Sequence, residues 1–170
     1  MYIYKKVFSV ALQASVVFLI TFLIYPGTVL NTHFDFLEGN SSAKAWFNIL
    51  MITIFSFGDT IGRFLAGPIQ IFNSKTMNLL TYGRVIFVAS AILIQKKSGP
   101  AWLFQADWFK ILHIWIFAAT NGYNMAAVML LGPQRVQKVD KERAGLIMNF
   151  HLIVGVCVGA FFAAFVMNKI

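Results

Sequence analysis

Residues 46–72 read WFNILMITIFSFGDTIGRFLAGPIQIF, an apolar run that contains only two ionisable side chains, Asp59 and Arg63. About 20 mostly apolar residues are enough to cross the hydrocarbon core of a bilayer as an α-helix. The run lacks the alternation of period two that marks the strands of a membrane barrel. Because lipid cannot satisfy exposed backbone groups, the run is predicted to be a transmembrane helix.

Four similar apolar runs lie on either side of this one, at residues 7–30, 77–94, 108–131 and 144–167. Short polar segments connect them, and no stretch has the composition of a soluble domain. We therefore predict an all-α integral membrane protein with five transmembrane helices, in which residues 1–170 form a single transmembrane lobe.

The composition supports this assignment, since 59% of the residues are hydrophobic and only 12% are charged. A soluble domain carries about 25% charged residues, which it needs to cover its surface. The net charge of +8 is spread singly or in pairs between the apolar runs. No basic stripe is present that could follow a phosphate backbone, so nucleic-acid binding is not predicted.

The same basic residues favour one orientation, with the N-terminus in the cytoplasm and the C-terminus outside. In that orientation seven lysines and arginines lie inside and five outside. Basic residues are enriched in cytoplasmic connections. The inside set is Lys5, Lys6, Lys75, Arg135, Lys138, Lys141 and Arg143, and the outside set is Lys44, Lys96, Lys97, Lys110 and Lys169.

Asp59 and Arg63 are the strongest candidates for function. Each ionised residue at a helix centre costs about 2.5–3.5 kcal/mol on insertion scales, so the pair is expected to face the bundle interior or an aqueous cavity. A spacing of four residues places both on one helical face, where they can form an ion pair. The pair either binds a polar solute or locks helices together, and the residues alone leave both readings open.

Two further polar features lie inside the apolar runs. Arg84 is predicted either to snorkel to the interface or to take part in gating. Asn121 and Asn124 flank Gly122-Tyr123 in the fourth run, where we favour interhelical hydrogen bonding over direct contact with a solute. Small residues recur at spacing four and predict close helix packing, at Gly58, Gly62 and Ala66, at Ala118, Gly122 and Ala126, and at Gly155, Gly159 and Ala163.

No enzymatic machinery, cofactor or metal site is predicted. The sequence has no nucleophile motif, phosphate-binding loop or zinc-ligand spacing. Cys157 is interpreted as a small buried apolar residue. His113 and His151 lie on different runs, and we interpret them as hydrogen-bonded core residues rather than as haem ligands.

Residues 55–63, Phe-Ser-Phe-Gly-Asp-Thr-Ile-Gly-Arg, resemble the Phe-Asn-x-x-Asp-x-x-Gly-Arg signature of the equilibrative nucleoside transporters. The resemblance extends in collinear order over nearly the whole chain. It includes an aromatic-proline pair of the family's seventh helix, an arginine of its ninth, and the last two helices with their connection. These features correspond to Tyr25-Pro26, to Arg84, and to Asn121-Gly122-Tyr123, Gly132-Pro133, Ala144-Gly145 and Met148.

The resemblance implies a lobe equivalent to helices seven to eleven of an eleven-helix, major-facilitator-like fold. It further implies facilitated diffusion of nucleosides by alternating access, with Asp59 and Arg63 holding the ribose hydroxyls. Ser56 stands where the family usually has asparagine, and Glu142 matches a possible cytoplasmic gate residue. The family's first six helices have no counterpart in the chain, so we expect a truncated or split product, or a partner lobe. We expect the plasma membrane as its location.

The alternative function is a non-transporting membrane scaffold or interaction protein built from such a lobe. In that case the ion pair between Asp59 and Arg63 is structural. Nucleoside flux through the chain in liposomes distinguishes the two hypotheses.

Overall fold

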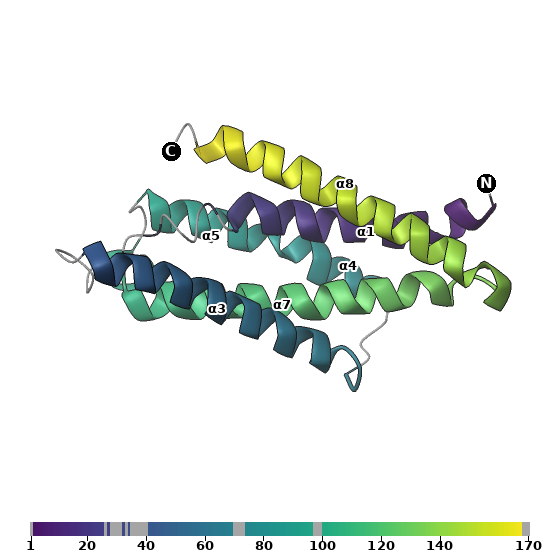
Figure 1. Cartoon of the computed structure of the whole chain (residues 1–170), viewed down its shortest axis with the longest axis horizontal. Coiled ribbons are helices and arrows are strands. Elements are labelled where there is room, and N and C mark those ends of the chain that lie inside the picture. The colour runs from purple at the N-terminus through teal and green to yellow at the C-terminus, as the bar shows by residue number, and fades with distance from the viewer. Residues whose placement is uncertain are drawn as a thin grey trace.

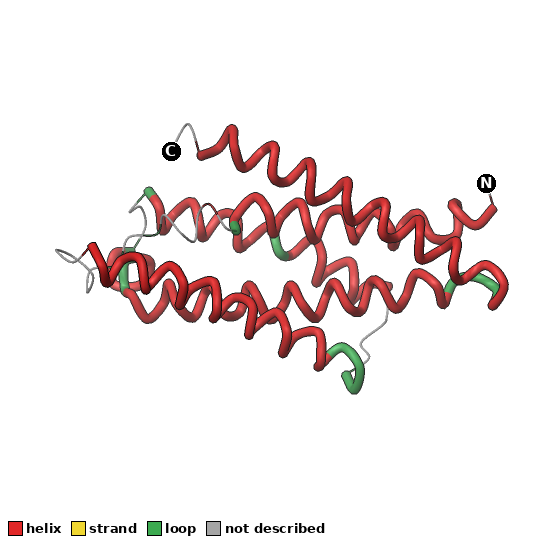
Figure 2. Tube along the Cα trace, in the orientation of Figure 1, coloured by secondary structure: helices red, strands yellow, loops and turns green. Residues whose placement is uncertain are grey.

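The computed structural model describes residues 2–25, 27, 32, 34, 41–69, 74–96 and 100–167. This part of the chain is almost entirely helical and contains no strand (Figure 2). Its helices are α1 (Tyr2–Ile24), α3 (Ser41–Leu65), α4 (Ser74–Gly83), α5 (Val85–Gln95), α6 (Ala101–Phe104), α7 (Asp107–Gln134) and α8 (Lys141–Met167), with a 3-10 turn, η2 (Lys138–Asp140).

The long helices run roughly along one axis and are arranged as two closely packed pairs (Figure 1). Helix α1 packs along α8, and α3 packs along α7. Helix α1 also contacts α7, which joins the two pairs, and the α4–α5 segment lies against both α1 and α7. The prediction of an all-α membrane protein is confirmed.

Small residues explain the tight packing of α3 on α7. A side chain on Gly62 would overlap the backbone of Ala119, and one on Gly122 would overlap the backbone carbonyl of Asp59. Gly58 approaches α7 less closely, since a Cβ added there would be 3.0 Å from the Ala118 Cβ. Without these glycines the two backbones could not approach each other, as in other small-residue contacts in membranes.

The α1–α8 contact is built in the same way. Gly155 of α8 faces the backbone of Ser15, and Gly159 faces Leu19 one turn further along α1. The Ser15 hydroxyl also donates a hydrogen bond of 2.6 Å to the backbone oxygen of His151. The predicted packing role is therefore confirmed for these glycines as well as for those of α3 and α7.

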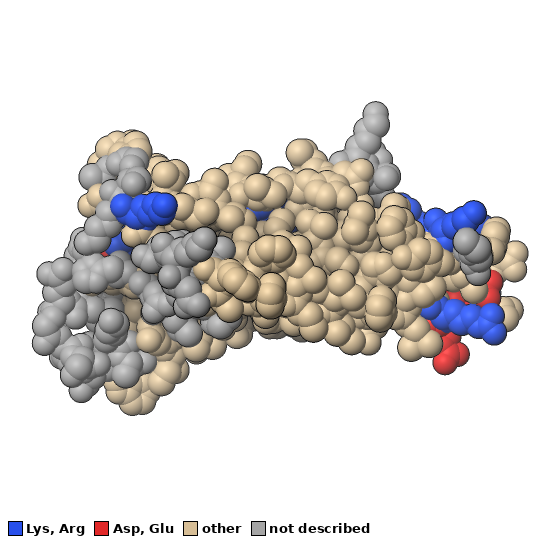
Figure 3. Space-filling model, turned by 90° about the horizontal axis from the view of Figure 1, so that it is seen from above, with Lys and Arg blue, Asp and Glu red and all other residues tan. Residues whose placement is uncertain are grey.

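The outer surface suits a bilayer. By length and composition four helices of the described chain can cross a membrane, at Tyr2–Ile24, Thr76–Gln95, Asp107–Gln134 and Lys138–Phe165. Helix α3 has 25 residues but is not among the four, and it is the helix that contains Asp59 and Arg63. On the face shown in Figure 3, lysines and arginines gather at the two ends, and the middle is largely free of charge.

The helix ends differ from the predicted spans in informative ways. Helix α3 ends at Leu65, where residue 72 was expected, because Gly67 and Pro68 form a turn in which the proline ring disfavours a helical residue before it. The run at 77–94 is interrupted at Arg84 between α4 and α5, where the Phe87 N–H donates to the Arg84 carbonyl at 2.9 Å. This bond spans three residues instead of four, as in a tightened 3-10 turn.

Candidate functional site

The centre of the site is the predicted ion pair on α3. Arg63 Nε lies 2.7 Å from Asp59 Oδ2, which confirms the pairing that the spacing of four residues predicted. The Asp59 side chain is 16% exposed and that of Arg63 is 50% exposed. The pair is therefore neither sealed in protein nor fully open, and it can be approached from outside the packed helices.

Asn121 of α7 holds the second carboxylate oxygen. Its Nδ2 donates to Asp59 Oδ1 at 2.7 Å. One oxygen of Asp59 is therefore held by Arg63 of α3 and the other by Asn121 of α7. This contact and the bond between Asn124 and Thr81, at 3.2 Å, confirm the prediction that the two asparagines form interhelical hydrogen bonds. The close approach at Gly122 brings Asn121 within reach, since the next residue of α7 touches the Asp59 backbone.

Arg84 lies behind this pair, with only 1% of its surface exposed. Of the two alternatives for Arg84, snorkelling to the interface is excluded, because the α4–α5 break directs its side chain between α1 and α7. Its Nη2 donates to the Thr21 hydroxyl at 3.1 Å and to Asn121 Oδ1 at 3.2 Å. Its Nη1 donates to the Thr120 hydroxyl at 3.0 Å and to the Phe117 carbonyl at 3.3 Å, and the guanidinium carbon lies 4.6 Å from the centre of the Phe117 ring.

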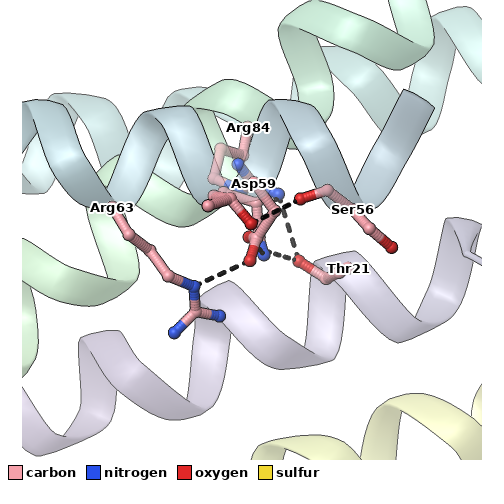
Figure 4. Close-up of polar contacts among 7 residues, drawn as sticks. Thr21, Ser56, Asp59, Arg63 and Arg84 are labelled. Carbon is pink, nitrogen blue, oxygen red and sulfur yellow. Dashed lines mark hydrogen bonds and ion pairs between the residues drawn. The ribbon is translucent and has the colours of Figure 1, made fainter. Parts of the chain in front are cut away.

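Thr21 completes the network from α1, although no feature of the sequence indicated this role. Its hydroxyl lies 2.6 Å from Asn121 Oδ1 and 2.7 Å from the Val17 carbonyl. Figure 4 shows Asp59 between the two arginine side chains, with Thr21 beside them. A threonine within an apolar helix commonly donates to the carbonyl four residues earlier, so its presence does not predict a polar site. The role of Thr21 is recognised only from its contact with Arg84.

The pair still has groups with which to bind a ligand. Each Asp59 oxygen accepts one bond from the described residues, although a carboxylate oxygen can accept two. Within the same part of the chain, Arg63 uses only its Nε, and both terminal amino groups make no hydrogen bond. The site can therefore accept from hydroxyl groups and donate to oxygens at once.

Ser56 and Tyr25 lie near the pair without joining it. The Ser56 side chain is exposed, and its backbone carbonyl accepts a bond of 2.8 Å from the Thr60 hydroxyl. Tyr25 stacks on Phe55, one turn before Asp59, with ring centres 4.0 Å apart and planes 8° apart. Pro26, the neighbour of Tyr25, lies outside the described residues.

The remaining sequence candidates are not part of this cluster. Glu142 is exposed in the first turn of α8, and no contact in the described chain links it to Asp59.

His113 bonds to the Ser90 hydroxyl at 2.6 Å, and His151 bonds through Nδ1 to the Ile147 carbonyl at 3.0 Å, as expected of core histidines. Cys157 is exposed on α8, so the prediction that it is buried is wrong.

Comparison with known proteins agrees with this geometry. The model of the nucleoside transporter family matches residues 1–168, nearly the entire chain. The chain belongs to the nucleoside transporter family. Its relatives are transporters, and the family is not one of enzymes.

Individual relatives of this family member come from animals and plants. It is 29% identical to human equilibrative nucleoside transporter 2 over 168 residues, and 29% identical to equilibrative nucleoside transporter 1 of Rattus norvegicus over 167 residues. Each alignment covers 93% of the chain. Equilibrative nucleotide transporter 8 of Arabidopsis thaliana is 25% identical over 147 residues, or 85% of the chain.

The chain is much shorter than these relatives. The aligned part covers 35% of the human protein, 36% of the rat protein and 35% of the plant protein. The family member described here thus spans about a third of the length of the curated relatives it matches.

Proposed function

We propose that the chain forms one lobe of a facilitative nucleoside carrier, in which Asp59 and Arg63 bind the ribose hydroxyls. The observation that carries this proposal is the partly exposed ion pair, in which Asn121 holds one oxygen of Asp59 and Arg63 the other. A carboxylate accepts from two neighbouring hydroxyls while a guanidinium donates to their oxygens, which suits the vicinal diol of a pentose. The names of the relatives support nucleosides as the solute class.

The proposal includes a second lobe. Alternating access needs two bundles that rock about a central site, and the chain aligns with about a third of each relative. We infer that the Asp59–Arg63 face meets a complementary lobe, on the same or a separate chain, in a major-facilitator-like arrangement. In this proposal Ser56 and the Tyr25–Phe55 stack border the solute. Glu142, in the first turn of α8, serves as a gate element on the cytoplasmic side.

We also propose that the chain lies in the plasma membrane with its N-terminus in the cytoplasm. Helix α7 runs the length of the molecule, and its end lies at the same end of the bundle as the start of α1 (Figure 1). Basic residues dominate that end, which favours the cytoplasmic side. They are Lys5, Lys6, Arg135, Lys138, Lys141 and Arg143.

Uridine uptake tests the carrier function in two settings. The chain is expressed in cells that lack nucleoside uptake, both alone and in place of the matching segment of human equilibrative nucleoside transporter 2. We expect uptake in the second setting and its loss in Asp59→Asn, which removes the negative charge and preserves the shape. Asp140→Asn, in the 3-10 turn, is the matched control and should transport normally.

Two outcomes contradict the proposal. The first is full uptake by Asp59→Asn at an unchanged amount of protein, which would remove Asp59 from the binding site. The second is the absence of uptake in both settings although the protein is retained in the membrane. That result favours the alternative of a non-transporting membrane scaffold.

A further inference from the structure

We propose that Asn121 and Arg84 are positioning residues, which orient the Asp59 carboxylate from behind so that its free lone pairs face a vicinal diol. The inference deepens the proposed function and rests on it for the identity of the ligand. Its structural part concerns only the hydrogen bonds around Asp59, which can be tested without a ligand.

The first step is that the surroundings of Asn121 permit only one orientation of its side-chain amide. The Oδ1 atom lies 2.6 Å from the Thr21 hydroxyl and 3.2 Å from Arg84 Nη2, and both of these groups can donate. The Nδ2 atom lies 2.7 Å from Asp59 Oδ1, which can only accept when ionised. A flipped amide would place NH₂ against the guanidinium and a carbonyl against the carboxylate.

The second step is that Arg84 determines which end of the amide faces Asp59. Arginine has donors and no acceptor, so it requires the carbonyl end of Asn121 at its own side. The same guanidinium donates to the Thr21 oxygen, and the Thr21 hydroxyl lies within donating distance of both Asn121 Oδ1 and the Val17 carbonyl. A directed chain of donors thus runs from Arg84, partly through Thr21, to Asn121 and on to Asp59.

The third step is that the guanidinium is held too firmly for it to rotate away. It is contacted by two residues of α7 besides Asn121, through the Thr120 hydroxyl and the Phe117 carbonyl and ring. Its Nε–H is buried and has no hydrogen-bond partner within the described chain. An unsatisfied buried donor is costly, and such costs are typically retained at functional sites.

These steps leave Asp59 immobilised between Arg63 on one oxygen and Asn121 on the other. A binding group that is held before the ligand arrives loses less entropy on binding, and small displacements weaken binding strongly. Arg84 and Asn121 need not touch the ligand to determine its affinity. They act through the direction in which Asp59 points.

The fold supplies a matched control one turn further along α7, where Asn124 pairs with a threonine of α4 instead of α1. Thr81 of α4 and Asn124 of α7 are fully or almost fully buried and bond to each other at 3.2 Å. This pair resembles Thr21 and Asn121 in chemistry and burial but has no contact with Asp59 within the described residues. Thr81→Val and Asn124→Leu therefore reproduce the structural cost of Thr21→Val and Asn121→Leu without touching the proposed relay.

The first experiment is infrared spectroscopy of the purified chain in lipid nanodiscs, with its aspartates labelled by ¹³C. The carboxylate band of Asp59 is identified as the one that disappears in Asp59→Asn. We expect this band to shift in Asn121→Leu, in Arg84→Lys and, by less, in Thr21→Val, and to stay unchanged in Thr81→Val and Asn124→Leu. An unshifted band in Asn121→Leu and Arg84→Lys overturns the proposal, as does an equal shift in the control variants.

The second experiment compares uridine with 2′,3′-dideoxyuridine as ligands of the chimera in which the chain replaces the matching segment of human equilibrative nucleoside transporter 2, with the same substitutions introduced. Loss of a hydrogen bond to a charged group weakens an interaction by about tenfold or more. We expect Asn121→Leu to weaken uridine binding by about tenfold and dideoxyuridine binding by much less, whereas Asn124→Leu changes both alike. Equal weakening by Asn121→Leu contradicts a role through the diol.

The two experiments fail separately. A shifted carboxylate band in the chain, together with a chimera that binds neither ligand, leaves the relay intact and refutes the proposed nucleoside site. Normal uridine binding with an unshifted band in Asn121→Leu refutes the relay and leaves the nucleoside site standing.

Discussion

Gly122 of α7 packs directly against the backbone carbonyl of Asp59 on α3. The contact that allows the two helices to approach is thus also the one that brings Asn121 to the Asp59 carboxylate. Helix packing and site geometry are therefore inseparable at this position.

Gly122→Ala is expected to weaken the α3–α7 contact. The added methyl group would meet Asp59 and Arg63 backbone atoms, which cannot move as a flexible side chain can. Overpacking of this kind costs about 1–3 kcal/mol in the free energy of unfolding, measured by denaturant titration in mixed micelles.

Gly145→Ala is the control for this substitution. Gly145 also lies in a helix, but nothing lies within 4 Å of an added Cβ there. It should leave the unfolding free energy unchanged or raise it by up to about 1 kcal/mol, because alanine favours the helix more than glycine does. Equal destabilisation by both variants would contradict the packing argument.

Phe55→Ala should loosen the junction of α1 with α3. Phe55 is buried and stacks on Tyr25, and an aromatic pair contributes about 0.5–1.5 kcal/mol beyond its buried area. The unfolding free energy should fall by at least that amount. Phe57→Ala, two residues away and 63% exposed, is expected to change it little. A larger effect at Phe57 would mean that the stack does not hold the helices together.

Arg63→Lys keeps the charge and is nevertheless expected to impair nucleoside binding. Arg63 uses Nε for Asp59 and has two terminal amino groups left, whereas a lysine ammonium cannot serve both partners in the same geometry. We expect about tenfold weaker binding of uridine to the chimera with human equilibrative nucleoside transporter 2, the equivalent of about 1.4 kcal/mol.

Arg135→Lys provides the comparison, since Arg135 makes a single bond of 2.8 Å to the Ser9 hydroxyl at one end of the molecule. That variant should bind uridine as the wild type does. Unchanged binding by Arg63→Lys would show that a point charge suffices at position 63.

The orientation can be tested by labelling introduced cysteines in a Cys157→Ala background. Val139 in η2 is 89% exposed and Trp102 in α6 is 76% exposed, and α7 separates them by the length of the bundle. Val139→Cys should react with an impermeant maleimide only after digitonin treatment, and Trp102→Cys should react in intact cells. The reverse pattern would invert the proposed topology.

Local features of the sequence predicted the helices and the ion pair, because both follow from short spacings. The apolar run lengths indicated membrane helices, and the spacing of Asp59 and Arg63 indicated their contact. The predicted end of α3 lies too far along the chain, because the apolar run continues through Gly67 and Pro68, beyond the last helical residue. The relay was not predictable from local spacing, since Thr21, Arg84 and Asn121 lie on three different segments and meet only after the helices pack.

The low hydrophobicity of α3 has a consequence for the synthesis of the protein. Two ionised residues make this helix expensive to transfer alone into lipid, and it is not among the helices that can cross by composition. Its glycine face is matched by α7, which leaves the ribosome only after α4 and α5 have followed α3. We therefore expect α3 to insert stably only after its later-made neighbour has arrived, so substitutions in α7 should be visible first as unintegrated α3.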